Sequence, residues 1–199
     1  MHPDQAKWDQ RYRNAQSAGK ASKILEHYQS LLPHEGEALD IACGLGGNAL
    51  LLAHHGLDTY AWDISPVAIQ TLAEQALHSG YFIQTEVRDV AKRPPGPNKF
   101  DVIVVSYFLE RDLFPALVDA LRPDGLLFYQ TFTENHFSDL GPGNPNFRLW
   151  PNELLTQVAD MQVLAYHENY LPWLEKAVDE ACVVAKKHAI QDIARSSSI

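Results

Sequence analysis

Strand-like and helix-like segments alternate along most of this chain, and this alternation restricts the fold more than any other feature of the sequence. The clearest strand is the uninterrupted, valine-rich run from Phe100 to Ser106. Such a run is typical of a strand that is buried on both faces of a parallel sheet. Alternating strands and helices form βαβ units, so we expect an α/β fold with a parallel sheet and helices on both of its faces.

The other elements follow from apolar periodicity and from turn residues. Ser65 suits a helix N-cap and Pro66 the first helical turn, in a helix that should end near Gly80. Two further helices are expected within residues 4–32, broken near Ser17–Gly19, and others over 48–55, 114–121 and 151–159. Strands are expected over 37–42, 58–62, 81–87, 126–132, 162–170 and 180–185, with a turn at 122–125.

Composition and charge restrict the class of protein and of partner. With 199 residues, 46% of them hydrophobic, the chain can form one globular domain with a sizeable core. Its apolar runs fall far short of the ~20 residues of a membrane span, and Met1–Gln5 does not resemble a signal peptide. Cys43 and Cys182 lie far apart, which favours reduced thiols and a cytoplasmic location. A net charge of −9 disfavours nucleic acid and favours a small-molecule partner.

Candidate site residues lie at the ends of the first two expected strands, where open α/β sheets bind their ligands. The first strand runs into Asp40–Gly47, whose glycines let the backbone turn sharply and approach a ligand closely. The second strand ends in Asp63, about twenty residues past the first glycine, where a carboxylate can accept both ribose hydroxyl protons. Together the two ends predict a crevice that binds a nucleoside.

The glycines alone leave two classes of nucleoside open. Gly44-x-Gly46-x-x-Ala49 also satisfies the dinucleotide fingerprint, so an NAD(P)-binding oxidoreductase is one alternative. Asp40, however, lies at the strand end, where its carboxylate would repel a pyrophosphate and would suit a zwitterionic amino acid with a sulfonium. The chain also begins with helices and ends with a helix and two strands, which fits an antiparallel addition at the sheet edge.

Residues 8 to about 186 resemble the class I methyltransferases that depend on S-adenosylmethionine (SAM). The segment 39–48 resembles their motif I, Asp63 their ribose-binding acid, and Asp89-Val90 their adenine-contacting position. The pair Ser106-Tyr107 lies at the end of the fourth strand, where the methionine end of the cofactor usually lies in that family. The segment 121–127 is similar to the family's turn before strand five, although that turn usually reads Pro-Gly-Gly and Asp124 replaces one glycine.

The opening Trp8-Asp9-Gln10-Arg11-Tyr12 resembles that of the tellurite-resistance and thiopurine-type subgroups, in which an N-terminal helix folds over the cofactor. The resemblance implies that Trp8 shields the sulfonium and that Arg11 holds the methionine carboxylate. Ordinary helix packing is the other interpretation of Trp8 and Tyr12.

The resemblance also implies a domain organisation and a cofactor site. We expect a Rossmann-like, mostly parallel seven-stranded sheet in residues 33–190, an N-terminal helical lid in 1–32 and a flexible tail in 191–199. The cofactor is SAM, and no metal is expected because no histidine spacing indicates a metal site. The predicted cofactor-binding residues are Trp8, Arg11, Asp40, Ala42, Gly44, Gly46, Asp63, Ile64, Asp89, Val90 and Ser106.

The predicted reaction is methyl transfer to a small molecule, with a thiol or a metalloid oxyanion favoured because such nucleophiles need little base catalysis. A SAM-binding module without turnover is the remaining alternative. No residue is assigned as catalytic. The long stretch 133–150 is expected to be functional, and the candidate substrate-facing residues are Tyr107, Arg111, Thr133, Glu134, His136 and Arg148. Cys43 invites a nucleophile hypothesis at a helix N-terminus, but we favour a packing role.

Overall fold

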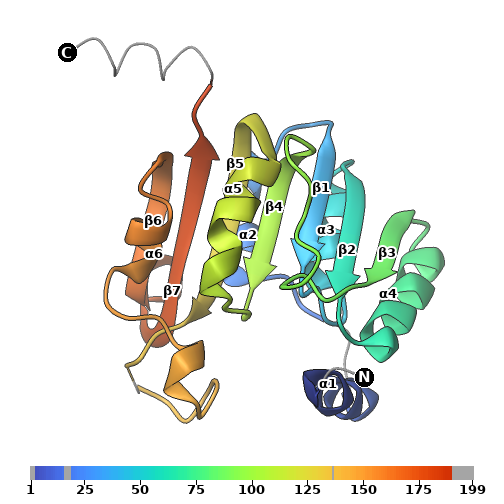
Figure 1. The fold of residues 1–199 in the computed structure, drawn as a ribbon, viewed down its shortest axis with the longest axis horizontal. Coiled ribbons are helices and arrows are strands. Elements are labelled where there is room, and N and C mark those ends of the chain that lie inside the picture. The colour runs from blue at the N-terminus through green and yellow to red at the C-terminus, as the bar shows by residue number, and fades with distance from the viewer. Residues whose placement is uncertain (1–2, 16–18, 136, 190–199) are drawn as a thin grey trace.

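The computed structural model describes residues 3–15, 19–135 and 137–189. Within them, strands form one seven-stranded sheet in the order β3-β2-β1-β4-β5-β7-β6, laid out across Figure 1. Strands β1 to β5 are parallel, and β7 is antiparallel to both of its neighbours. The strands are β1 (Glu37–Ile41), β2 (Asp58–Asp63), β3 (Ile83–Val87), β4 (Phe100–Ser106), β5 (Leu121–Phe132), β6 (Met161–Leu171) and β7 (Lys176–Lys187). The predicted fold class is confirmed.

Helices cover both faces of this sheet. They are α1 (Pro3–Arg13), α2 (Lys23–His27), α3 (Gly47–His54), α4 (Pro66–His78), α5 (Phe114–Ala120) and α6 (Glu153–Gln157). The predicted cap of α4 is confirmed, because the Ser65 hydroxyl accepts a hydrogen bond from the backbone N–H of Ala68.

The side chains of strand β4 belong to two hydrophobic cores, one on each face of the sheet. Val102 and Val104 are fully buried in the core that contains Ile24 and Leu52 of the helices α2 and α3. Ile103 and Val105 are fully buried in the opposite core, against Phe114 and other residues of α5. Alternate side chains therefore point to opposite faces and both sets are buried, which is why the strand reads as one continuous apolar run.

Two strand boundaries differ from the prediction by four or more residues. β5 begins at Leu121, because Leu121 pairs with Phe100 before the register moves to Val102 and Leu126, and the predicted turn 122–125 forms an irregularity inside the strand. Asp124 has a φ of 66° within this irregularity. β7 begins at Lys176, four residues earlier than expected, because its first residues pair with the end of β6.

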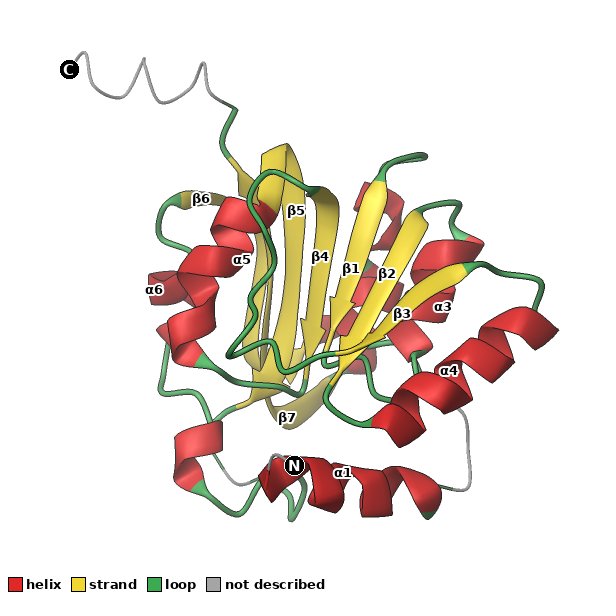
Figure 2. Ribbon diagram, turned by 45° about the vertical axis from the view of Figure 1, so that its right-hand side comes forward, coloured by secondary structure: helices red, strands yellow, loops and turns green. Residues whose placement is uncertain are grey.

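The predicted lid, residues 1–32, divides into two parts with different surroundings. Helix α1 lies across the ends of the strands (Figure 2), whereas α2 packs on the sheet, where Ile24 and Leu25 are fully buried. Among the described residues of this range, the position of α1 suits a lid, and the lid itself stays a prediction. The predicted tail, most of the break at Ser17–Gly19, and His136 lie outside the described residues.

No helix in the described ranges is long and apolar enough to cross a membrane.

Candidate active site

The turn after β1 brings the backbone close to the end of β2. Ala42, Gly44 and Gly46 all have positive φ angles, of 52°, 52° and 82°. The backbone N–H of Gly44 donates a hydrogen bond of 2.9 Å to the Asp63 carboxylate. A residue with a Cβ rarely adopts such angles, so the glycines give this turn its shape, and Asp63 ties the two strand ends together.

Asp63 is buried at the end of β2, with 4% of its surface exposed. Its second carboxylate oxygen accepts a bond of 2.8 Å from the backbone N–H of Ser65. Burial and the negative charge of Asp9 raise the pKa of Asp63, although the backbone hydrogen bonds oppose the shift. A carboxylate oxygen can accept more than one hydrogen bond, so Asp63 retains the capacity to accept hydroxyl protons from a ligand.

Asp40 lies underneath the turn. It is fully buried and accepts hydrogen bonds from the backbone N–H of Ala49 (3.1 Å) and from Nδ2 of Asn48 (3.3 Å). Burial raises its pKa to about 7, against the effect of these bonds. Asn48 also donates to the Ser106 hydroxyl (3.1 Å). The structure thus joins Asp40 and Ser106 through Asn48, and Asp40 shapes the turn and the start of α3 from below.

Helix α1 lies beyond the carboxyl ends of the strands, on the outer side of the turn (Figure 2). The Ser65 hydroxyl donates to the buried carboxylate of Asp9 over 2.5 Å, which fastens α1 to the start of α4. A Cβ on Gly44 would lie 3.0 Å from the Tyr12 hydroxyl, so the Tyr12 side chain covers this glycine. Burial and the nearby Asp63 raise the pKa of Tyr12, which keeps its phenol protonated.

Trp8 and Arg11 lie farther out on α1. The Trp8 ring stacks on Tyr12 with 5.8 Å between centroids, and the Arg11 guanidinium lies 5.3 Å from the Trp8 ring. Trp8 therefore packs against Tyr12, as the packing interpretation expects, and also lies beside Arg11, as the cofactor interpretation expects. The sequence motif 8–12 includes Asp9 and Tyr12, but it did not indicate that Asp9 fastens α1 to α4 or that Tyr12 covers Gly44.

Residues 19–22 run across the start of α3. A Cβ on Gly47 would come within 2.2 Å of the Lys20 backbone, and the backbone N–H of Ser22 donates to the Asn48 side chain over 2.8 Å. A dinucleotide places its pyrophosphate at the helix N-terminus that follows such a turn. In this chain that helix start is covered by backbone, which argues against the dinucleotide alternative.

The remaining predicted cofactor residues line the same edge of the sheet. Ile64 is half-buried beside Asp63, and Val90 is buried in the core that also contains Leu109. Asp89 forms an ion pair of 2.9 Å with Lys92. The structure thus brings the residues after β1, β2, β3 and β4 to one edge, and their role in cofactor binding stays a prediction.

Comparison with known proteins agrees with this arrangement. Residues 38–125, which contain β1 to β4 and the start of β5, match the family model described as a methyltransferase domain. Residues 38–125 of this chain therefore resemble a methyltransferase domain. The curated putative methyltransferase YqeM of Bacillus subtilis is 24% identical over 126 residues, which cover 57% of this chain and 49% of that protein. The match thus spans about half the length of that relative.

Two solved structures share the fold of most of this chain. TehB from Haemophilus influenzae has a TM-score of 0.69 at 22% identity, covering 91% of this chain and 67% of that chain. A structure that describes the conversion of a disulfide bond into a thioacetal group during echinomycin biosynthesis also has a TM-score of 0.69, at 18% identity. It covers 98% of this chain and 97% of that chain. At these identities the likeness establishes the fold.

SAM is the cofactor of this class of domain, and the residues at the turn fit it. Asp63 can accept the ribose hydroxyls, and the space over Gly44 is limited by the end of the Tyr12 side chain and not by backbone. The hydroxyl of buried Ser22 has no hydrogen-bond partner among the described residues. A zwitterionic amino acid moiety would satisfy such a group. Asp63, Gly44, Ser22 and the aromatic residues of α1 are thus the residues that would hold the cofactor.

The two candidate arginines hold the 133–150 segment in place. Arg111 pairs with the buried Glu153 through two bonds, of 2.6 and 2.9 Å, and also donates to the carbonyl of Arg148. Arg148 is buried and donates to the carbonyls of Pro142, Thr133, Asn135 and Leu140. The sequence made both arginines candidate substrate-facing residues, and these contacts favour a structural role.

The remaining candidates differ in exposure. Thr133 is buried and its hydroxyl donates to Asn169 over 2.8 Å, whereas Glu134 is exposed. Burial, with Asp40 and Asp63 nearby, raises the pKa of Cys43 well above its usual range, which is the opposite of an activated nucleophile. Tyr107 is 42% exposed beside the end of β4.

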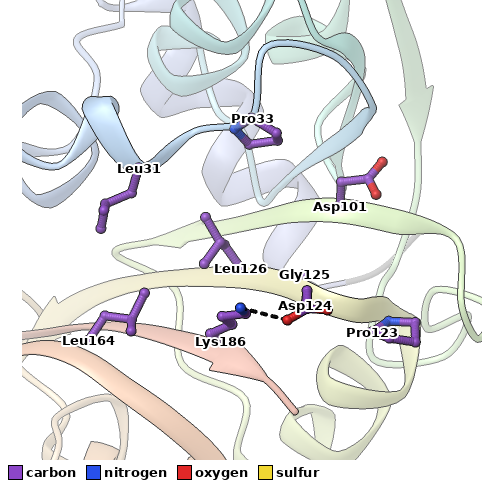
Figure 3. A pocket seen from close by; sticks show the side chains of 9 residues that line it. All are labelled: Leu31, Pro33, Asp101, Pro123, Asp124, Gly125, Leu126, Leu164 and Lys186. Carbon is purple, nitrogen blue, oxygen red and sulfur yellow. Dashed lines mark ion pairs between the residues drawn. The ribbon is translucent and has the colours of Figure 1, made fainter. Parts of the chain in front are cut away.

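A hollow of about 380 Å³ lies at the other end of the sheet, between Leu31, Leu126 and Leu164 (Figure 3). The ion pair between Lys186 and Asp124 crosses its floor. The hollow contains none of the residues of the glycine turn or of the strand ends, so we do not assign it to the active site.

Proposed function

We propose that this protein transfers the methyl group of SAM to a small-molecule thiol in the cytoplasm. The observation that carries the proposal is the buried Asp63, tied to the Gly44 backbone under α1 at the end of β2. When bound, the cofactor supplies an activated methyl group. The protein's residues then have to exclude water and hold the nucleophile in line with that methyl group.

Several features support a small acceptor. Helix α1 covers the turn from one side, and the segment 133–150 follows β5 on the other. That segment exposes the apolar side chains of Phe137, Leu140, Phe147 and Trp150, which suit an apolar molecule at the rim. The net charge of −9 disfavours nucleic acid as the acceptor.

A thiol is favoured over a metalloid oxyanion by the state of the arginines. Arg111 and Arg148 each donate four hydrogen bonds within the protein, so an anion would have to compete with the contacts that hold the 133–150 segment. The sulfur chemistry in the description of the structure from echinomycin biosynthesis agrees with a sulfur nucleophile.

The test begins with calorimetric titration of S-adenosylhomocysteine and NADH into the protein and into two variants, Asp63→Ala and Asp58→Ala. Asp58 is exposed at the start of the same strand, so it controls for loss of charge. We expect micromolar binding of S-adenosylhomocysteine, weakened about 100-fold in Asp63→Ala because two charge-assisted bonds are lost, and unchanged in Asp58→Ala. Binding of NADH alone would overturn the proposal.

Transfer of labelled methyl from SAM to thiophenol, 2-mercaptoethanol, selenite and tellurite then tests the acceptor. Methylation of the thiols supports the proposal. Methylation of the oxyanions alone would replace the thiol with the metalloid class. Cofactor binding without methylation of any protic or oxyanion acceptor would indicate a binding module instead.

A further inference from the structure

Four polar side chains from distant parts of the chain meet beyond the carboxyl end of β4. Glu180 of β7 is 6% exposed, and its carboxylate accepts a bond of 3.1 Å from the Lys23 ammonium of α2. Gln130 of β5 is fully buried and donates to the other carboxylate oxygen. The hydroxyl of Tyr107, the residue after β4, lies 3.5 Å from both carboxylate oxygens.

The orientation of Gln130 fixes the direction of the proton on Tyr107. The side-chain oxygen of Gln130 accepts a bond of 3.0 Å from the backbone N–H of Ile24, so its NH₂ group must point the other way. That group donates to the Tyr107 hydroxyl over 3.3 Å. Because the hydroxyl oxygen accepts from Gln130, the hydroxyl proton is left to point at Glu180.

Tyr107 is held in an unfavourable backbone conformation at this position. Its φ is 56°, in the left-handed region that a bulky residue rarely adopts. Its backbone N–H donates to the Gln130 carbonyl over 2.8 Å, and its ring lies 5.2 Å from that of Phe132. Such local strain persists where the surrounding structure requires it, and it is concentrated at functional sites. Here it places a 42% exposed ring beside the strand ends with its hydroxyl directed inward.

We propose that Glu180 is the proton acceptor of the methyl transfer and that the Tyr107 hydroxyl relays the proton to it. This inference rests on the proposed function. It restricts the substrate to acceptors that carry a proton on the attacking atom. A thiol is one such acceptor.

The step balances without any further reactant. The S–H bond of the acceptor breaks and its electron pair forms the new S–CH₃ bond. The acceptor's proton goes to the Tyr107 oxygen while the Tyr107 proton goes to Glu180. The electron pair of the old bond to methyl stays on the sulfur of the cofactor, which leaves as a neutral thioether. Glu180 afterwards returns its proton to solvent.

The charges around Glu180 are consistent with this role. Lys23 is its cationic partner, and Tyr107 and the buried thiol of Cys182 face it from β4 and from β7 itself. Burial, Glu180 and, more weakly, Cys182 and Glu26 raise the pKa of Tyr107, so the phenol stays protonated and can relay a proton but not act as the base. Burial and Glu180 raise the pKa of Cys182 to about 12, which excludes this thiol as a competing base.

The experiment compares two thiol probes with the same full-length protein and SAM. Thiophenol is largely ionised at neutral pH, whereas 2-mercaptoethanol is not. In Glu180→Gln, kcat/KM for 2-mercaptoethanol should fall about 100-fold at pH 7, and the value for thiophenol should change less than about 3-fold, because the thiolate itself is the nucleophile. Tyr107→Phe should show the same contrast.

The pH profile provides a second readout that a structural defect would not produce. With 2-mercaptoethanol the wild-type rate should vary little from about pH 6 to pH 8. In Glu180→Gln only the pre-ionised thiolate reacts, so the rate should rise about tenfold per pH unit. Glu175→Gln, an exposed carboxylate close to the start of β7, is the matched control and should behave as the wild type.

Binding of S-adenosylhomocysteine by each variant shows that the cofactor half of the site is intact. Equal loss of rate with both thiols, or an unchanged pH profile in Glu180→Gln, would overturn the inference and leave the methyltransferase function standing. Absence of thiol methylation by the wild-type protein would instead overturn the proposed function.

Discussion

The carboxyl edge of the sheet consists of two halves that are constructed differently. The half proposed to bind the cofactor, after β1 and β2, holds its acids Asp40 and Asp63 by backbone and nearby side-chain hydrogen bonds, and we call it the cofactor half. The half proposed to bind the acceptor, after β4, β5 and β7, is held by side chains far apart in the sequence, such as Lys23 with Glu180 and Arg111 with Glu153, and we call it the acceptor half.

Because of this difference, we expect the cofactor half to be rigid and the acceptor half to be adaptable. A turn fixed by its own backbone can bind one invariant ligand with little dependence on the rest of the chain. A half assembled from side chains can change its acceptor by a few substitutions while the cofactor turn stays the same, in line with the general rule that fold does not determine substrate.

The largest expected effect is on the pH dependence of the cofactor half. Because the folded-state pKa of Asp40 is raised to about 7, the folded protein holds this proton where the unfolded chain has lost it. The stability that Asp40 contributes is therefore present at low pH and lost as pH rises from about 4 to about 7. Asp40→Asn cannot ionise, so its unfolding free energy should exceed the wild-type value by at most about 4 kcal/mol at pH 8.

Denaturant unfolding at pH 5 and pH 8 measures this effect. Asp58→Asn, which is exposed, should leave the pH dependence unchanged. Parallel pH curves for the wild type and Asp40→Asn would show that the buried carboxyl does not change its protonation on folding.

In the acceptor half, Arg148→Ala should lower the unfolding free energy by about 3 kcal/mol, because four carbonyl groups lose a buried charged donor. The KM for the thiol should rise, whereas calorimetric binding of S-adenosylhomocysteine should change less than about 2-fold. The exposed Arg13 provides the control variant Arg13→Ala. A matching loss of cofactor affinity in Arg148→Ala would show that the two halves are not independent.

Asp9→Ala tests how α1 contributes to the cofactor half. The substitution removes the hydrogen bond from Ser65 that fastens α1, so stability should fall by about 1 kcal/mol and cofactor affinity by about fivefold. Gln10→Ala, on the exposed side of the same helix, should change neither. If calorimetry finds unchanged affinity in Asp9→Ala, α1 does not act as a lid.

The smallest effect is expected far from both halves. Asp124 has a φ of 66° at the opposite end of the sheet and an exposed ion pair with Lys186. Asp124→Gly relieves the backbone and loses a surface pair of little value, so thermal unfolding should show a gain of about 0.5 kcal/mol. Cofactor binding and methyl transfer should both stay at wild-type values. Altered catalysis in this variant would indicate coupling across the whole sheet.

The same contrast explains what the sequence could predict. The alternation of strands and helices, the α4 cap and the glycine turn depend on short-range patterns such as Ser65-Pro66 and the run from Phe100 to Ser106, and those predictions were confirmed or closely matched. In the acceptor half, Tyr107 was a candidate substrate-facing residue, but its contact with Glu180 could not be predicted, because the two residues lie 73 positions apart and no local pattern marks Glu180. Lys23 was placed in a lid, since its helix is amphipathic whether it covers a cofactor or a sheet face.

The position of β7 in the sheet also means that the two halves are completed at different times during synthesis. Every described contact that shapes the cofactor turn involves residues no later than Ser106. The acceptor half, in contrast, needs Glu180, and β7 must insert between β5 and β6 to present it. Since the chain is made from the N-terminus onward, the residues that shape the cofactor turn are all synthesised before the residue that completes the acceptor half.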